Sequence, residues 1–198
     1  MRRTGNPHQW EERNDCSQPD PLDTGAADAT SSAAAQATPR PGRYEIDTSC
    51  SAVTFRTRHL FGLAPVRGSF AIRAATIDVA EPVTDSSIHA EIDTASFRTG
   101  NGQRDVTVHS ARLLDAVRYP VITFISEGAG GPALPGMLTV RGVTRPVILS
   151  VEQSAVTTAS FTVRATTRID RAEFGVTAYR GLAGRYLDMT VEVRCVRT

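Results

Sequence analysis

The feature that most constrains the fold is an alternation of apolar and polar side chains that recurs from about residue 43 onward. In residues 52–59, Val53, Phe55 and His59 share one parity, whereas Arg56 has the other. A period of two residues is typical of a β-strand with one buried and one solvated face. A histidine on the apolar side, where the strand ends, is the unusual member of this pattern.

Similar runs follow along the chain, and turn signals rich in Gly and Pro separate them. Such spacing predicts antiparallel hairpins. The expected strands are 43–49, 52–59, 66–73, 86–97, 121–126, 136–142, 145–153, 159–170 and 185–196. The glycine-rich segment 128–136 is expected to be a hairpin loop.

One segment, 103–120, has the spacing of a helix instead, and Pro120 ends it. The side chains at helical spacing are Val106, Ser110, Leu113, Leu114 and Val117. One helix and about eight strands favour an all-β protein, a closed eight-stranded antiparallel barrel with one helix between strands, over a sandwich. Closure also removes the exposed sheet edges that such strands would otherwise present.

Barrels of this size either fill themselves with side chains or hold one small ligand. Gly68, Ala90 and Ala165 fall at inward positions, where small side chains leave volume unless larger neighbours occupy it. The alternation alone leaves both outcomes open.

The first 41 residues differ in composition, with much Ala, Ser, Thr, Pro and Asp and few large apolar side chains. A segment of this kind buries too little surface to offset its conformational entropy. We therefore predict a disordered tail over 1–41 and a barrel domain over 42–198.

Composition excludes several classes of function. The formal net charge is +1, so no global attraction to nucleic acid is expected, and the absence of Lys excludes a Schiff base. No nucleophile-elbow or phosphate-loop motif occurs. With no long apolar run and no leader-like segment, the chain is expected to be cytoplasmic, or secreted if its start is misassigned.

Cysteine and histidine give no metal or disulfide framework. Cys16, Cys50 and Cys195 contain no paired spacing, and the opposite parities of Cys50 and Cys195 disfavour a bridge between them. Besides His59, the histidines are His8, His89 and His109, and no HExxH motif occurs, so no metal is expected.

Four blocks of sequence, taken in order, resemble the YceI-like family. They are 44–70, with its ID dipeptide and a strand that ends in His59; 97–126, with an RD pair, a helix and a YP-x-I-x-F strand; 136–151; and 168–176. Two features depart from the family pattern. Cys50-Ser51 stands where His-Ser is common, and the N-terminal tail stands where secreted members carry a signal peptide.

The resemblance implies a lipocalin-like barrel with an elongated apolar cavity. It implies binding of a polyisoprenoid or similar long-chain amphiphile, for sequestration or transport, without catalysis and with no cofactor beyond such a ligand, a polyprenyl lipid or an isoprenoid quinone. The inward residues expected to line the cavity are Phe55, Phe70, Ile92, Phe124, Val140, Leu149, Val163, Met189 and Val191. Leu113 and Leu114 would cover it, and His59 would lie near the polar end of the ligand.

Several assignments stay open at this point. Arg104-Asp105 is expected to form an ion pair that closes the helix onto the barrel, rather than a ligand contact. Arg145 and Arg171 lie at turns and suit either salt bridges or a diphosphate. The alternatives to a carrier of isoprenoid or acyl lipid are an enzyme of isoprenoid-type metabolism with the same cavity and a filled barrel whose tail recruits a partner. No stable membrane insertion is expected, and a homodimer is left open.

Overall fold

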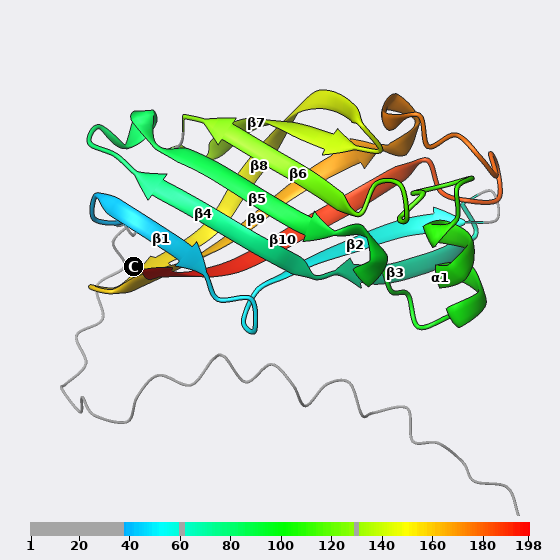
Figure 1. Cartoon of the computed structure of the whole chain (residues 1–198), viewed down its shortest axis with the longest axis horizontal. Coiled ribbons are helices and arrows are strands. Elements are labelled where there is room, and N and C mark those ends of the chain that lie inside the picture. The colour runs from blue at the N-terminus through cyan, green and yellow to red at the C-terminus, as the bar shows by residue number, and fades with distance from the viewer. Residues whose placement is uncertain (1–37, 60–61, 129–130) are drawn as a thin grey trace, which may run out of the picture. The chain divides into compact units, whose positions relative to one another are not determined.

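A closed antiparallel barrel is built from the strands, with one short helix and several long connections at one end (Figure 1). The structure is a computed structural model that describes residues 38–59, 62–128 and 131–198. The elements are β1 (Gly42–Ile46), β2 (Ala52–His59), β3 (Ala64–Phe70), β4 (Ile72–Val79), η1 (Val83–Asp85), β5 (Ser87–Asp93), η2 (Thr94–Ser96), α1 (Gly102–His109), β6 (Val121–Glu127), β7 (Ala133–Val140), β8 (Val143–Val156), β9 (Ser160–Asp170), η3 (Arg171–Phe174) and β10 (Tyr186–Arg197).

Strand β10 closes the barrel. One of its edges pairs with β9 along almost its whole length. Its other edge pairs first with β2, where Asp188 lies opposite Arg56, and then with β1, where Cys195 lies opposite Ile46. Strands β1 and β2 thus share one edge of β10, and β4 and β3 pair with them in turn, so β1 with β2 and β4 with β3 each count as one strand of the wall. The expected eight-stranded antiparallel barrel is confirmed.

The wall breaks between β3 and β4, where a single strand over 66–73 was expected. The amide of Ala71 donates to Ser96 Oγ at 2.7 Å, and its carbonyl accepts from the amide of Asp93 at 3.1 Å. A register shift between Ile72 and Ala74 then changes which residues face inward. This bulge shifts the alternation, so β4 has no continuous two-residue pattern in the sequence.

The glycine-rich segment 128–136 is only partly a loop. Strand β7 begins at Ala133, and Ala133–Gly136 pair with β8. Gly136 can lie in this wall because the ring of Phe124 covers it, and a Cβ there would collide with that ring. The expectation of a loop is therefore wrong for residues 133–136.

Helix α1 is shorter than expected. Asn101 caps its start by accepting from the amide of Arg104 at 3.0 Å, and the helix ends at His109. The carbonyl of Ser110 then accepts from the amides of Leu113 and Asp115, which builds tight turns in place of further helix. The helix predicted over 103–120 is therefore wrong over 110–120. Of the side chains expected on its apolar face, Val106 and Val117 are 71% and 96% exposed, whereas Leu113 is buried.

Aromatic rings of the core meet beneath α1. The rings of Phe55 and Phe97 stack with centroids 5.3 Å apart, and Phe70 packs edge-on against Phe97 at the same separation. Gly68 lies opposite Phe55 and leaves room for its ring. Rings that cover inward glycines in this way fill one part of the lumen.

The described chain begins just before β1. The hydroxyl of Tyr44 donates to the carbonyl of Arg40 at 2.9 Å, and Arg197 donates to the carbonyl of Pro41 at 3.0 Å. The tail predicted over 1–41 lies outside the described residues except for 38–41. No helix among the described residues is long and apolar enough to cross a membrane.

Two buried hydroxyls give a matched test of the wall. Thr94 and Ser126 are each 1% exposed. Ser126 Oγ donates to backbone carbonyls, at 2.5 Å in the case of Pro135, whereas Thr94 Oγ1 has no partner among the described residues. An unpaired buried hydroxyl destabilises the folded state, while a paired one stabilises it.

We therefore expect Thr94→Val to raise the free energy of unfolding by about 1 kcal/mol and Ser126→Ala to lower it by about 1 kcal/mol. Urea denaturation of both variants measures the difference. A loss of stability in Thr94→Val would show that its hydroxyl has a partner, such as a buried water.

Candidate functional site

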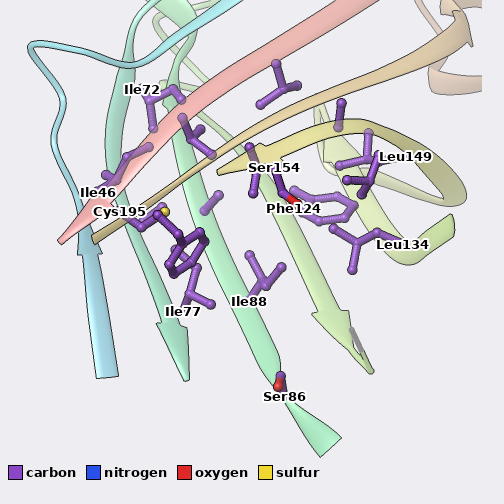
Figure 2. Close-up of a pocket in the computed structure, with 18 of the residues that line it drawn as sticks. Ile46, Ile72, Ile77, Ser86, Ile88, Phe124, Leu134, Leu149, Ser154 and Cys195 are labelled. Carbon is purple, nitrogen blue, oxygen red and sulfur yellow. The ribbon is translucent and has the colours of Figure 1, made fainter. Parts of the chain in front are cut away.

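The barrel lumen contains two adjacent cavities. The deep cavity, at the end of the barrel near η1, has a volume of about 310 Å³ (Figure 2). The mouth cavity, beneath α1, has a volume of about 570 Å³. Both are lined by Val53, Ile92, Leu138, Ile169 and Met189, which mark the level at which they meet.

The deep cavity is almost wholly apolar. Side chains from β1, β4, β5, β6, β8 and β10 converge on it in Figure 2. Its few polar groups are hydroxyls and a thiol, and one of them, Ser86 Oγ, already accepts from the amide of Ala80 at 3.0 Å. None of its lining residues among those described is charged.

Small side chains leave this space open. Ala75, Ala90 and Ala165 all line the deep cavity. Both outcomes considered for small inward residues therefore occur in one barrel. Rings fill the wall at the glycines, and a cavity remains at the alanines.

Cys195 lies in the wall of the deep cavity. It is fully buried, and it is a free thiol, so it does not bridge to Cys50. Burial raises the pKa of the Cys195 thiol to about 12, because the apolar surroundings disfavour the thiolate. A thiol of this kind packs as a small apolar side chain and is a poor nucleophile at neutral pH.

The mouth cavity differs in character from the deep cavity. The rings of Phe55, Phe70 and Phe97 lie in its wall, and α1, the turns after it, other strand residues and the connection 175–185 also contribute. Its lining includes the cations Arg104 and Arg171 together with His59, and no carboxylate lines it among the described residues. An amphiphile placed along the lumen would therefore meet all of the charge at the mouth.

Arg171 fastens the connection 175–185 over the mouth cavity. Its guanidinium donates to the carbonyls of Val176 at 2.6 Å, Gly184 at 2.7 Å and Ala183 at 3.1 Å. Burial lowers the pKa of Arg171, and the nearby charge of Asp170 opposes that shift. This planar fork of donors ties both ends of the connection to η3.

Asp170 joins the same connection to the barrel from the other side. It accepts from the amide of Ala172 at 2.9 Å and from the guanidinium of Arg185 at 2.7 Å. The hydrogen bond from Arg185 lowers the pKa of Asp170. The carboxylate is therefore ionised near neutral pH and engaged with the fold.

Arg104 and Asp105 converge on Thr99. Asp105 accepts from the amide and the hydroxyl of Thr99, and Arg104 Nε donates to the same hydroxyl at 2.7 Å. The pair thus anchors α1 to the preceding connection through a shared threonine. The expectation that Arg104 and Asp105 form an ion pair that closes the helix onto the barrel is corrected accordingly. Arg104 Nη2 also donates to the carbonyl of Thr99 at 3.2 Å, and Arg104 lines the mouth cavity.

The structure places each residue predicted to contact a ligand along this lumen. Phe124, Leu149, Val163 and Val191 line the deep cavity; Phe55, His59, Phe70, Leu113, Leu114 and Val140 line the mouth cavity; Ile92 and Met189 line both. Their contact with a ligand stays a prediction. Arg145, by contrast, is exposed and donates to the carbonyl of Thr144.

Sequence reasoning missed the lining that comes from irregular segments. Phe174, Val176, Tyr179 and Leu182 line the mouth cavity but follow no alternation. Leu134 lines the deep cavity from a segment expected to be a loop. The one available signal was the block 168–176, which resembles a family motif and includes Phe174 and Val176.

The described residues hold no group of three or more His, Cys, Asp or Glu side chains suited to a metal ion.

The fold and its lumen define a class of small β-barrels with an internal apolar cavity. Within that class, a family model described as a YceI-like domain matches residues 44–196. The chain belongs to the YceI-like family.

Two relatives show the level of sequence identity. A UPF0312 protein of Vibrio parahaemolyticus is 27% identical over 169 residues, which cover 78% of this chain and 87% of the relative. A UPF0312 protein of Pseudomonas savastanoi is 34% identical over 104 residues, which cover 49% of this chain and 53% of that protein.

Two solved structures share the fold. A polyisoprenoid binding domain from Saccharophagus degradans has a TM-score of 0.64 at 15% identity, and the match covers 80% of this chain and all of that one. Burkholderia cenocepacia BcnA has a TM-score of 0.63 at 23% identity, with 75% of this chain and 98% of that one covered.

The fork of Arg171 gives a test of how the mouth is held. Lysine keeps the positive charge but cannot reach three carbonyls, so Arg171→Lys should lower the free energy of unfolding by on the order of 3 kcal/mol. Faster hydrogen exchange of amides in 175–185 would accompany this loss. Arg180 is exposed in the same connection, so Arg180→Lys is the matched control. It should change neither the free energy of unfolding nor the hydrogen exchange.

Proposed function

We propose that this protein binds a long-chain amphiphilic lipid of the polyisoprenoid type inside the barrel, for sequestration or transport. The observation that carries the proposal is the pair of adjacent cavities, one apolar and one with charge at its edge. The tail of the ligand occupies the deep cavity, and its head lies in the mouth cavity.

The deep cavity supplies the affinity. Each CH₂ group moved from water into such a space contributes about 0.8 kcal/mol, so a chain of several isoprene units needs no specific polar contact to bind tightly. A head at the mouth avoids the cost of burying a polar group beside Ile77 and Phe161, where few partners exist.

The mouth cavity supplies the polar contacts. His59 is half-buried at the end of β2 and lines this cavity, as do the guanidinium groups of Arg104 and Arg171. These groups are donors that suit a hydroxyl, a quinone oxygen or a phosphate. The side chains proposed to contact the head are therefore His59, Arg104 and Arg171.

The cavities support binding rather than catalysis. Their described lining contains no carboxylate, and Cys195, the one thiol there, has a pKa of about 12. His59 is a group of the kind that general acid–base chemistry uses, but no carboxylate among the described lining residues orients its ring. The structural neighbour from Saccharophagus degradans is a polyisoprenoid binding domain, which supports a lipid ligand here.

Native mass spectrometry of the purified full chain, followed by organic extraction, tests the proposal. We expect a co-purifying species of discrete mass with a polyprenyl fragmentation pattern, or uptake of one ligand from a panel of prenyl quinones and prenyl diphosphates. A protein that carries nothing and takes up nothing from this panel would contradict a lipid-binding role.

Two neighbouring alanines on β4 allow a sharper test. Ala75 lines the deep cavity and Ala74 is exposed on the outer wall. Ala75→Phe should weaken lipid binding at least about tenfold, since the ring takes volume that CH₂ groups would occupy. Because the ring enters an existing cavity, the thermal unfolding temperature should stay close to that of the parent protein.

Ala74→Phe is the matched control and should bind lipid as the parent does. If Ala75→Phe instead lowered the unfolding temperature sharply, as an overpacked core does, the barrel would be a filled one and the carrier proposal would lose its basis.

A further inference from the structure

Large apolar side chains are exposed at the α1 end of the barrel. Leu63, between β2 and β3, is 82% exposed. Val106, on α1, and Val117, after it, are also largely exposed. Tyr179 and Leu182 in the connection 175–185 are also exposed. All five come from connections or the helix at one end (Figure 1), and we call them the mouth rim.

The mouth rim is continuous with the proposed ligand site. Tyr179 and Leu182 line the mouth cavity and are exposed to solvent at the same time. An apolar path therefore runs from the outer surface into the lumen at this end. A lipid that entered or left here would meet the rim first.

The same end is strongly basic. Its described connections and helix, 62–63, 94–120, 141–142 and 171–185, contain three carboxylates: Asp105, Asp115 and Glu173. They contain eight arginines: Arg98, Arg104, Arg112, Arg118, Arg141, Arg171, Arg180 and Arg185. Asp170, at the end of β9, pairs with Arg185, which leaves seven arginines against the three carboxylates of these segments.

The opposite end of the barrel has no such charge. Its described connections, 38–41, 80–86, 128, 131–132 and 157–159, contain Arg40 against Glu81 and Asp85. The contrast between the two ends shows that the charge at the α1 end is not a property of the arginine-rich composition as a whole.

From this geometry we infer that the α1 end docks reversibly on the surface of an anionic lipid bilayer. Apolar side chains inserted at the level of the lipid headgroups, together with arginines that attract anionic lipids, are the two contributions that hold a peripheral protein on a membrane. Tyr179 has the amphipathic ring that favours this interface. The docked barrel would present its mouth cavity directly to the bilayer.

A bilayer fits these observations better than a protein partner does. The apolar residues come from three segments, 62–63, 94–120 and 171–185, and the last two of these also carry seven of the arginines. A packed protein interface would have to pair or desolvate those charges. A fluid layer of anionic headgroups accommodates them wherever they lie. The inference concerns the outer surface and does not depend on which lipid occupies the lumen.

Vesicle flotation with the full chain tests this inference. We expect binding to phosphatidylcholine vesicles that contain phosphatidylglycerol, weaker binding to phosphatidylcholine alone, and loss of binding as salt screens the charges. Leu63→Asp combined with Val117→Asp should lower partitioning onto the anionic vesicles about tenfold or more. Arg112→Gln combined with Arg180→Gln should reduce the preference for anionic vesicles.

The outer wall supplies the controls. Ile148 on β8 is 60% exposed, so Ile148→Asp removes an exposed apolar side chain away from the mouth rim and should leave partitioning unchanged. Arg40→Gln combined with Arg56→Gln removes the same charge from exposed positions elsewhere. Equal effects of the rim and wall variants, or no binding to anionic vesicles, would overturn the inference.

Light scattering distinguishes the other occupants of this surface. If the Leu63→Asp and Val117→Asp variant lost self-association instead of vesicle binding, the rim would be a contact between copies of the chain and the bilayer inference would be wrong. Ligand uptake in detergent, measured by native mass spectrometry, separates this result from the proposed function. The rim variants should keep their ligand, and Ala75→Phe should keep its vesicle binding.

Discussion

The pairing of β10 on both of its edges is the constraint on which the rest of the structure depends. With β9 on one side and β1 and β2 on the other, the sheet has no free edge at this strand, and inward side chains of every strand face one another. Val191 and Val53, opposite each other across this closure, both line the deep cavity. A lumen exists only because this pairing is complete.

What fills the lumen is decided locally, by the size of a few inward side chains. Gly68 and Gly136 are covered by the rings of Phe55 and Phe124, which lie on neighbouring strands. At Ala75 the residue opposite is Ala90, so neither side of the pair supplies a ring. The rings occupy the space over the two glycines and line what remains of the lumen, whereas the alanine pair leaves its side of the deep cavity open.

The strands could be predicted because their signal is local. A residue such as Phe55 or Met189 faces inward wherever the strand is regular, so alternation alone placed it in the lumen wall. The end of α1 could not be predicted in this way. Leu113 has helical spacing from Val106, and only the turns around the Ser110 carbonyl show that the helix has stopped.

The position of the connection 175–185 could not be predicted from the sequence for a related reason. No periodicity marks Tyr179 or Leu182, and their position depends on Arg171, whose three bonds to carbonyls are tertiary contacts. Arg171 lies at the end of β9, so the regular wall and the irregular mouth are joined at one guanidinium group. Local sequence patterns therefore predict the strands of the wall but not the position of the connection that Arg171 holds.

The two ends of the barrel differ in a way that gives the lumen a direction. The connections at the end near η1 are short, and the deep cavity there has no charged lining among the described residues. Long connections at the α1 end place Arg104 and Arg171 in the lining of the mouth cavity. Leu182, in one of these connections, lines the same cavity and is also exposed to solvent. Polarity therefore increases from the deep cavity to the mouth and on to the basic outer surface. An amphiphile with its tail in the deep cavity and its head at the mouth has the same gradient, and so does the interface of a bilayer from which such a lipid would come.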